Sequence, residues 1–451
     1  LDSHIADKEL TEINSDELLD ETNDDSFYRI AEAGLDTTQN SSIQRRVRTT
    51  GFYFSLTNPY ISKFINYMYF NIPKDYDYSG MESRSILEAL AGVKYYMVKE
   101  GSESDLPFDF TEKIAEGETA EGQVSLYKSG DAMPLAYSYD NYVSMDDFEN
   151  MSVTERMEAM LNGAVVDSSS LTKAELSDNA VDILDTVETK GYVDVDENGF
   201  FVRKNATVTL KLKEYKNAEC YLIFKNLKFK GISERKTYDD GQWAGLTQYE
   251  KNKVYAEDRY GHTPTTSSMQ IAAGDISKIL EIYSPGADFY CGRSDFLVNL
   301  GYSGETPEEV TITFRNPGYY SFDSMSVMAL PTDGISEKLA KLKEDSLENI
   351  EISTNQIKGE ISLDKAKMLV FSIPYSEGWT VYVDGKREEL KEANIMYMAV
   401  ELEAGKHDIM LKYETPYLRI GAIMTLAGIL MFLLMQLCVI IKTMVLSDRR
   451  K

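Results

Sequence analysis

The sequence predicts an α+β fold that is mainly β, with an N-terminal α/β unit, two β-sandwich-like modules and one transmembrane helix. Three observations support this fold class. Thirty tyrosines and many Val, Ile and Thr stretches favour strands. A weak internal repeat suggests two similar β-modules in tandem. The segment Ile420–Ile441 has 22 residues without a charge, and a helix of that length spans the ~30 Å hydrocarbon core of a bilayer.

The N-terminal part divides into two segments. Residues 1–26 are acidic and poorly patterned, so we expect them to be mobile. Residues 27–145 are expected to form the α/β domain. In it, residues 27–33 are predicted to form a strand, and residues 57–71 a helix capped by Thr57 or Asn58 with Pro59 in its first turn.

Residues 146–348 are expected to hold a helix followed by the first β-sandwich module. Ser152 and Glu155 have the spacing of a capping box, which predicts a helix start. Apolar residues at helical spacing predict an amphipathic helix over Ile335–Leu347. Between them, Thr237–Ser268 is predicted to be a long polar loop, either functional or mobile.

Residues 349–417 are expected to form the second, smaller β-sandwich module, with Asp384-Gly385 as a two-residue hairpin turn. The repeat aligns residues 218–231 with 366–379, and residues 308–320 with 405–417. Two sandwiches in tandem would explain it. A coincidence of generic strand patterns is the alternative.

Residues 418–442 are predicted to form the transmembrane helix and residues 443–451 a basic cytoplasmic tail. Four basic residues follow the apolar segment, and basic flanks stay in the cytoplasm. We therefore expect a cell-membrane protein whose residues 1–417 are extracytoplasmic. Residues 1–10 lack the basic start and apolar core of a signal peptide. The chain is therefore expected to be a fragment with further membrane spans upstream, or else the product of signal-peptide removal.

Small and polar residues lie on one stripe of the predicted transmembrane helix. They are Gly421, Thr425, Gly428 and Gln436. Such a stripe allows close contact with another membrane helix, so upstream helices of the same protein are the expected partners, together with membrane lipid. A lone anchor with incidental glycines is the alternative.

The charge excludes one class of partner. The formal net charge is −27, and the last ten residues carry four basic and one acidic residue, which leaves −30 for residues 1–419. Such a surface repels nucleic acid and anionic lipid. The sequence therefore argues against nucleic-acid binding and against a peripheral membrane role.

No metal or cofactor site is expected in this chain. The three cysteines and three histidines lack ligand spacing, and Cys220 and Cys291 are expected to be free thiols. Residues 194–199 copy the first half of a calcium loop, but its twelfth position is Asn205 instead of a carboxylate. A tight β-turn at Asn198-Gly199 is the preferred interpretation. No nucleophile elbow or phosphate-binding loop is present, so no catalytic residue is assigned.

One group of residues is a candidate glycan site. An indole ring can stack on the apolar face of a sugar, and Trp379 follows Tyr375 closely in the sequence. Asp384 and Lys386 could bond sugar hydroxyls. The alternative, which we favour, is a core tryptophan beside a solvated hairpin.

Several of these segments resemble the YfhO family of bacterial membrane proteins. The resemblance is carried by residues 27–30 and 90–95, and above all by FSIPYSEGWTVYVDGK (371–386) and EAGKHDIMLKY (403–413) before the final span. It implies a polytopic protein similar to GT-C glycosyltransferases, which move sugar from a polyprenyl-phosphate donor to an envelope polymer such as lipoteichoic acid. In that class the catalytic carboxylate lies in an early outer loop, which this chain does not contain.

Two functions therefore stay open. The first is the extracytoplasmic domain of a membrane glycosyltransferase whose catalytic part lies upstream of this chain. The second is a non-catalytic, membrane-anchored surface module that binds glycan or a partner protein. Several upstream membrane spans would favour the first function, and none would favour the second.

Overall fold

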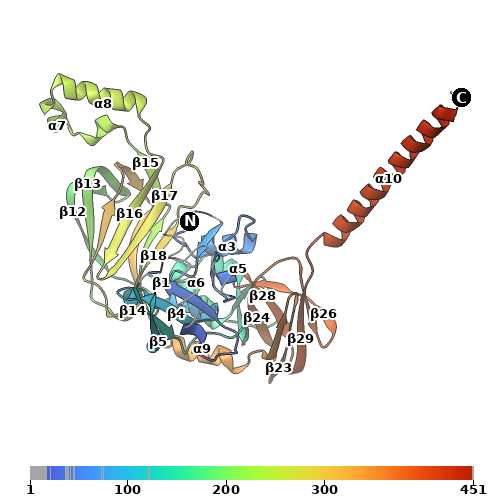
Figure 1. The fold of residues 1–451 in the computed structure, drawn as a ribbon. Coiled ribbons are helices and arrows are strands. Elements are labelled where there is room, and N and C mark those ends of the chain that lie inside the picture. The colour runs from blue at the N-terminus through green and yellow to red at the C-terminus, as the bar shows by residue number, and fades with distance from the viewer. Residues whose placement is uncertain are drawn as a thin grey trace.

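The computed structural model describes residues 18–20, 22–35, 40, 42–43, 46–72, 74, 76–119 and 122–448. The predicted fold class is confirmed: the chain is mainly β, with an N-terminal α/β unit, two β-sandwiches and one long C-terminal helix. In Figure 1 the long helix projects from the body at one end, and a small helical arm projects at the other.

The N-terminal unit is a four-stranded sheet with helices packed on it. Its strand order is β1-β4-β6-β5, and β1 runs parallel to β4. Its elements are β1 (Arg29–Ala33), β4 (Val93–Lys99), β5 (Glu112–Thr119), β6 (Gly122–Lys128), α3 (Pro59–Tyr67) and α4 (Ser85–Leu90), with a hairpin of β2 (Gly51–Tyr53) and β3 (Asp77–Ser79). Asn58, one of the two predicted caps, caps α3 by accepting a hydrogen bond from the Tyr60 amide, and the helix ends at Tyr67, four residues before its predicted end.

Part of the predicted mobile segment packs against this sheet. Leu18 and Leu19 are buried beside Ile30 and Met97. Asp24 accepts a hydrogen bond from Lys94 at 2.5 Å. Residues 1–17 and 21 lie outside the described residues, so their predicted mobility stays a prediction.

A central group of helices and short strands follows. It contains β7 (Ala136–Tyr139), β8 (Asn141–Ser144), α5 (Met145–Glu149), α6 (Val153–Asn162), β9 (Ala164–Val166) and β10 (Thr172–Lys173). The predicted capping box is present at α6: Glu155 N–H donates to Ser152 Oγ, and Ser152 N–H donates to Glu155 Oε2. Helix α9 (Ile335–Glu344) later returns to this group with Ile335, Leu339 and Leu342 buried, as their spacing predicted.

The first β-sandwich faces two sheets against one apolar core. One sheet has the order β15-β20-β13-β19-β16-β17, with β12 also paired to β13, and the other has the order β11-β21-β14-β18. Their bounds are β11 (Val181–Asp182), β12 (Leu184–Asp196), β13 (Gly199–Leu212), β14 (Lys216–Lys225), β15 (Lys228–Gly231), β16 (Thr266–Ala273), β17 (Ile276–Tyr283), β18 (Phe296–Glu305), β19 (Glu309–Phe314), β20 (Gly318–Ser321) and β21 (Ser324–Pro331).

The second β-sandwich repeats this topology on a smaller scale. Its sheets are β22-β23-β29-β25-β26 and β27-β28-β24-β7. The new strands are β22 (Glu348–Ser353), β23 (Gln356–Leu363), β24 (Lys367–Pro374), β25 (Trp379–Val383), β26 (Lys386–Glu388), β27 (Lys391–Ala393), β28 (Tyr397–Leu402) and β29 (Gly405–Tyr413). The path β12-β13-β19-β16-β17 in the first module corresponds to β22-β23-β29-β25-β26 in the second. The two segments aligned by the repeat, β14 with β24 and β19 with β29, hold equivalent positions.

The sheets do not follow the predicted domain boundaries. Strand β7 belongs by sequence to the predicted α/β domain, but it pairs with β24 of the second sandwich. The pairing joins residues more than 200 positions apart, which a local pattern cannot reveal. The central group and the second module are therefore joined by a shared sheet.

The predicted polar loop at Thr237–Ser268 is wrong in part, because it contains helices. They are α7 (Asp240–Gly245) and α8 (Gln248–Tyr260), each started by a capping box, at Asp239 and Thr247. Val254 is the one residue of α8 that is buried, so the apolar periodicity that reveals a helix is missing. These helices form the arm seen at the upper left of Figure 1.

Two smaller predictions concern turns and cysteines. Residues 194–199 form the β12–β13 hairpin, in which Asp196 Oδ1 accepts from the Asn198 amide. Asp384 and Gly385 both have positive φ, 52° and 76°, and form the predicted β25–β26 turn. Cys220 is buried and forms no disulfide with Cys291.

Helix α10 (Leu418–Asp448) holds the predicted span. Within it, Leu418–Lys442 is long and apolar enough to cross a membrane. No residue in its apolar 18-residue window is buried by the rest of the described chain. Residues 449–451 of the predicted tail lie outside the described residues.

Candidate functional site

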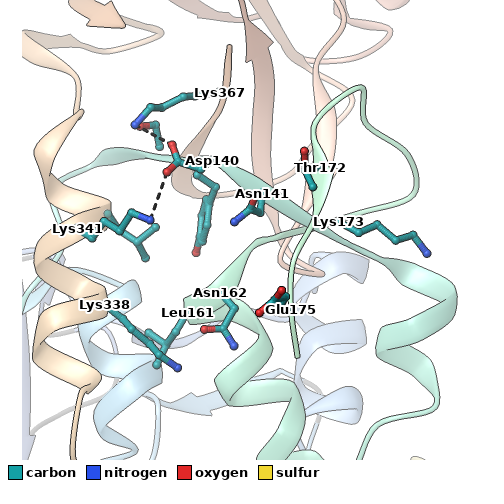
Figure 2. A pocket seen from close by; sticks show the side chains of 13 residues that line it. Asp140, Asn141, Leu161, Asn162, Thr172, Lys173, Glu175, Lys338, Lys341 and Lys367 are labelled. Carbon is teal, nitrogen blue, oxygen red and sulfur yellow. Dashed lines mark ion pairs between the residues drawn. The ribbon is translucent and has the colours of Figure 1, made fainter. Parts of the chain in front are cut away.

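A polar pocket opens where the central helices meet the second sandwich (Figure 2). Its volume is about 400 Å³. It is lined by residues from β7 and β8, the end of α6, β10, α9 and β24: Ser138, Tyr139, Asp140, Asn141, Leu161, Asn162, Thr172, Lys173, Glu175, Lys338, Lys341, Leu342 and Lys367. We call it the lysine pocket.

Local structure explains how these side chains meet. The helix α6 ends at Asn162 because Gly163 leaves the helical conformation, which brings Leu161 and Asn162 to the pocket. Lys338 and Lys341 are three residues apart on α9 and therefore share a face. Lys367 is the first residue of β24, beside the shared strand β7.

Asp140 is the electrostatic centre of the pocket. Lysine ammoniums lie 2.9 Å (Lys367), 3.2 Å (Lys365) and 3.4 Å (Lys341) from its carboxylate oxygens, and the Asp140–Lys341 pair is drawn in Figure 2. Lys367 Nζ and Asp140 Oδ1 form an ion pair, but their geometry does not meet that of a hydrogen bond. Burial alone would raise the pKa of Asp140, but its lysine contacts outweigh burial and lower the pKa to about 2.

Lys367 is held between two carboxylates. It pairs with Asp345 at 2.5 Å as well as with Asp140, and its side chain is 9% exposed. Burial favours the neutral amine, but the two carboxylates outweigh it and raise the pKa of Lys367. This lysine is therefore a fixed charge in the wall of the pocket.

Other groups of the pocket are available to a ligand. Among the described residues, the Lys338 ammonium has no ion-pair partner, and Ser138 Oγ is buried without a hydrogen-bond partner. The lining holds four lysines and two carboxylates in a chain of net charge −27. Hydroxyls and the amides of Asn141 and Asn162 complete a set of donors and acceptors suited to a polyol or sugar carrying negative charge.

The described residues contain no group of three or more His, Cys, Asp or Glu that could hold a metal ion. The charged and polar lining of the lysine pocket supports binding through charge-assisted hydrogen bonds.

The four predicted glycan residues lie at two separate places. Trp379 and Asp384 stand at opposite ends of β25, roughly 16 Å apart at the usual rise of a strand. Trp379 packs on Tyr413 with 5.2 Å between ring centroids, and Tyr375 packs on Tyr60 at 4.7 Å. The four residues therefore do not form a single site.

The other two glycan candidates belong to the hairpin turn. Asp384 accepts from the Asp408 amide at 2.9 Å and lies 2.9 Å from His407 Nδ1. The Asp408 amide, followed by His407, lowers the pKa of Asp384. Lys386 is exposed. Asp384 therefore closes the turn, and glycan binding by any of the four stays a prediction.

The predicted helix-packing residues all lie exposed on α10. Thr425 Oγ1 donates to the Gly421 carbonyl at 2.8 Å, one turn earlier. Gly428 and Gln436 have open space around them in the described chain. Their role in helix packing stays a prediction.

Sequence reasoning missed the lysine pocket. Its residues come from five segments between positions 138 and 367, and only the fold brings them together. The one local signal was a group of lysines at 338, 341, 343, 365 and 367 in an acidic chain.

Comparison with known proteins decides the family. Residues 3–425 match the family described as "Bacterial membrane protein YfhO". The chain belongs to the YfhO family. A curated relative, the "Uncharacterized protein YfhO" of Bacillus subtilis (strain 168), is 20% identical over 355 residues, which are 78% of this chain and 36% of the relative. The YfhO chain described here thus spans about a third of that relative's length.

Solved structures add little to this assignment. An arabinofuranosyltransferase AftD from mycobacteria is 10% identical, with 55% of this chain and 23% of that chain covered and a TM-score of 0.15. A vicilin from Solanum melongena is 8% identical, with 47% and 71% covered and a TM-score of 0.11. TM-scores this low carry no argument about fold or activity.

Proposed function

We propose that this YfhO chain is the extracytoplasmic part of a polytopic membrane glycosyltransferase, with its catalytic groups outside the chain. The full-length enzyme would move sugar from a polyprenyl-phosphate donor to an envelope polymer such as lipoteichoic acid. No cofactor is needed within this chain. The observation that carries the proposal is the lysine pocket, a surplus of positive charge on a strongly acidic, membrane-anchored domain.

The size and chemistry of the pocket support a polymer segment as its ligand. A volume of about 400 Å³ lies within the usual range for small-ligand sites, roughly 300–1,000 Å³. Within the described chain, the Lys338 ammonium has no ion-pair partner and is a donor that the protein leaves available. An anionic group of a polyol would pair with it, and the acidic remainder of the surface would repel the polymer elsewhere.

The sidedness of the domain is also part of the proposal. Basic residues follow the apolar stretch of α10, and the rule for basic flanks places them in the cytoplasm. Residues 1–417 would then face the envelope polymers. The stripe at Gly421, Thr425, Gly428 and Gln436 would contact further membrane helices of the same protein.

The experiment compares charge reversal inside and outside the pocket. The double variant Lys338→Glu/Lys341→Glu is expressed from the full-length gene in a deletion strain. Lys228→Glu/Lys230→Glu, on exposed positions of β15, changes the net charge equally and serves as control. The sugar content of the purified envelope polymer is measured by NMR.

We expect the pocket variant to lose polymer glycosylation while its membrane level and the control variant stay normal. Unchanged sugar content in the deletion strain itself would contradict the glycosyltransferase proposal. Loss in the deletion strain but full activity of the pocket variant would contradict only the role of the lysine pocket.

One observation favours the second candidate, a surface module that binds a partner protein. The arm of α7 and α8 exposes Tyr249, Tyr255 and Tyr260, by 53–77%, and exposed tyrosines are common in protein interfaces. If this is the main function, replacing residues 234–262 by a short Gly-Ser linker abolishes the cellular phenotype and leaves polymer glycosylation unchanged.

A further inference from the structure

A second cavity lies between the N-terminal unit and the second sandwich. It has a volume of about 120 Å³. Its walls include Phe52 of the β2–β3 hairpin, Ile61 and Phe64 of α3, and Pro374 and Met396 of the second module, and Arg29 lines it as well. It is therefore an apolar cavity with one cationic residue.

Arg29 lacks a carboxylate partner. Its Nη1 donates to the Ala91 carbonyl and, at 3.1 Å, to Ser372 Oγ, and its Nη2 donates to the Ser372 carbonyl at 2.6 Å. These bonds use three of the five N–H donors of a guanidinium. The structure gives Arg29 no ion pair within the described chain, although the protein has 74 acidic residues.

A second guanidinium adds to the local positive charge. Arg29 and Arg48 both lie over the Phe27 ring, at 4.9 and 5.1 Å from its centroid. Burial, with the smaller repulsion of Arg48, lowers the pKa of Arg29, although an arginine stays protonated at neutral pH. Arg29 is half-buried, so a guanidinium without a compensating charge is costly there, and a bound anion would lower that cost.

Hydrogen bonds link the start of α3, beside the cavity, to the loop that leads into α10. Asn58 at the start of α3 donates to the Tyr375 carbonyl at 2.9 Å, and the Glu414 amide donates to the Gly378 carbonyl at 2.9 Å. Helix α10 begins at Leu418, so at most about 14 Å of chain separates Glu414 from the span. A lipid at the bilayer surface can therefore reach the loop beside the cavity.

We propose that this cavity binds the anionic headgroup of a membrane lipid. The guanidinium of Arg29 bonds the phosphate oxygens, and the apolar wall of α3 covers the first carbons of the chain. This inference is independent of the lysine pocket and of the proposed glycosyltransferase activity.

The net charge of the domain does not oppose such a site. Repulsion between the acidic surface and anionic lipid argues against peripheral binding from solution. In a domain anchored by α10, distant charges are screened beyond roughly 8–10 Å. The local guanidiniums then decide which headgroup binds.

The test measures lipid binding to the full chain in detergent micelles by native mass spectrometry. The probes are dioctanoyl phosphatidylglycerol, dioctanoyl phosphatidylcholine and free glycerol 1-phosphate. Arg29→Gln removes the cation. Ile61→Trp fills the cavity and leaves Arg29 in place. Arg387→Gln and Ile352→Trp, both at exposed positions, are the matched controls, and thermal unfolding reports the folding of every variant.

We expect the native chain and both controls to bind phosphatidylglycerol in preference to phosphatidylcholine. Each cavity variant is expected to weaken that binding by about tenfold or more, the effect of one charge-assisted hydrogen bond or of a blocked site. Because Arg29 also ties β1 to Ser372, Ile61→Trp keeps the test valid if Arg29→Gln fails to fold. Equal binding of both lipids, or equal binding by folded cavity variants and controls, would overturn the proposal. Glycerol 1-phosphate bound as tightly as the lipid would overturn the lipid as ligand and assign the cavity to a free phosphate.

Discussion

Truncation of Trp379 separates a structural role from a glycan-binding role. Trp379 is half-buried at the edge of the second sandwich core and packs on Tyr413. Removing a fully buried tryptophan side chain costs about 3–5 kcal/mol. Because Trp379 is only half-buried, we take about half of that cost, with the Tyr413 contact included. Trp379→Ala is then expected to lower the free energy of unfolding by about 2 kcal/mol.

The assay is urea unfolding of the full chain in detergent, followed by circular dichroism. With a slope of about 2 kcal/mol per molar urea, the variant is expected to shift the transition of the second sandwich down by about 1 M. A parallel titration with purified envelope polymer is expected to show affinity within about twofold of the native chain. The control is Trp243→Ala, on helix α7 of the arm. It should change the free energy of unfolding of the second sandwich by less than about 0.5 kcal/mol.

The reverse result would refute the reasoning. An unchanged transition together with lost polymer binding would make Trp379 a sugar platform. Losses of both stability and affinity in Trp379→Ala, but of affinity alone in Trp379→Phe, would also point to a direct contact with the ligand.

Three further predictions concern buried charge, close packing and the lysine pocket. Glu88 is 1% exposed, and burial raises its pKa to about 8, so the folded state holds a proton that the unfolded state loses above pH 4.5. The contribution of Glu88 to the free energy of unfolding is therefore largest at acid pH and is lost as pH rises through about 8. We expect the free energy of unfolding to fall by a few kcal/mol from pH 5 to pH 8, and Glu88→Gln to flatten this slope in urea titrations; a native slope in Glu88→Gln would contradict this assignment. A Cβ at Gly378 would lie 2.4 Å from the Tyr413 ring and 2.7 Å from the Glu414 carbonyl oxygen, so Gly378→Ala should destabilise the second sandwich by about 1–3 kcal/mol; thermal unfolding checks this, and an unchanged melting temperature would show that the loop adapts. Lys338→Glu should weaken binding of purified lipoteichoic acid several-fold with unchanged thermal unfolding, because Lys338 has no ion pair to lose within the described residues; unchanged binding in a titration would remove it from the ligand site.

Local signals in the sequence predicted local structure well. Asn58, the Ser152/Glu155 capping box and the Asp384-Gly385 turn each act through neighbours within four residues, and the structure places each as expected. The apolar span also needs no partner to be recognised. The repeat was visible because equivalent strands of both modules share a pattern: β14 and β24 are continuous buried runs, and β19 and β29 alternate.

Long-range pairing and polar helices escaped prediction. Strand β7 joins a sheet whose neighbour lies more than 200 residues away, and the lysine pocket depends on that pairing. Helix α8 buries only Val254, so its capping box at Thr247 and Glu250 was its one signal. The glycan residues looked like one group because they are close in sequence, but the extended β25 separates them.

Sugar transfer in isolated membranes tests the central claim most directly. Membranes with and without the full-length YfhO protein are supplied with a polyprenyl-phosphate-linked radioactive sugar and purified lipoteichoic acid. The account predicts that label enters the polymer only when the full-length protein is present, and that Lys338→Glu/Lys341→Glu reduces the transfer while Lys228→Glu/Lys230→Glu does not. Equal labelling in membranes that lack the protein would contradict it.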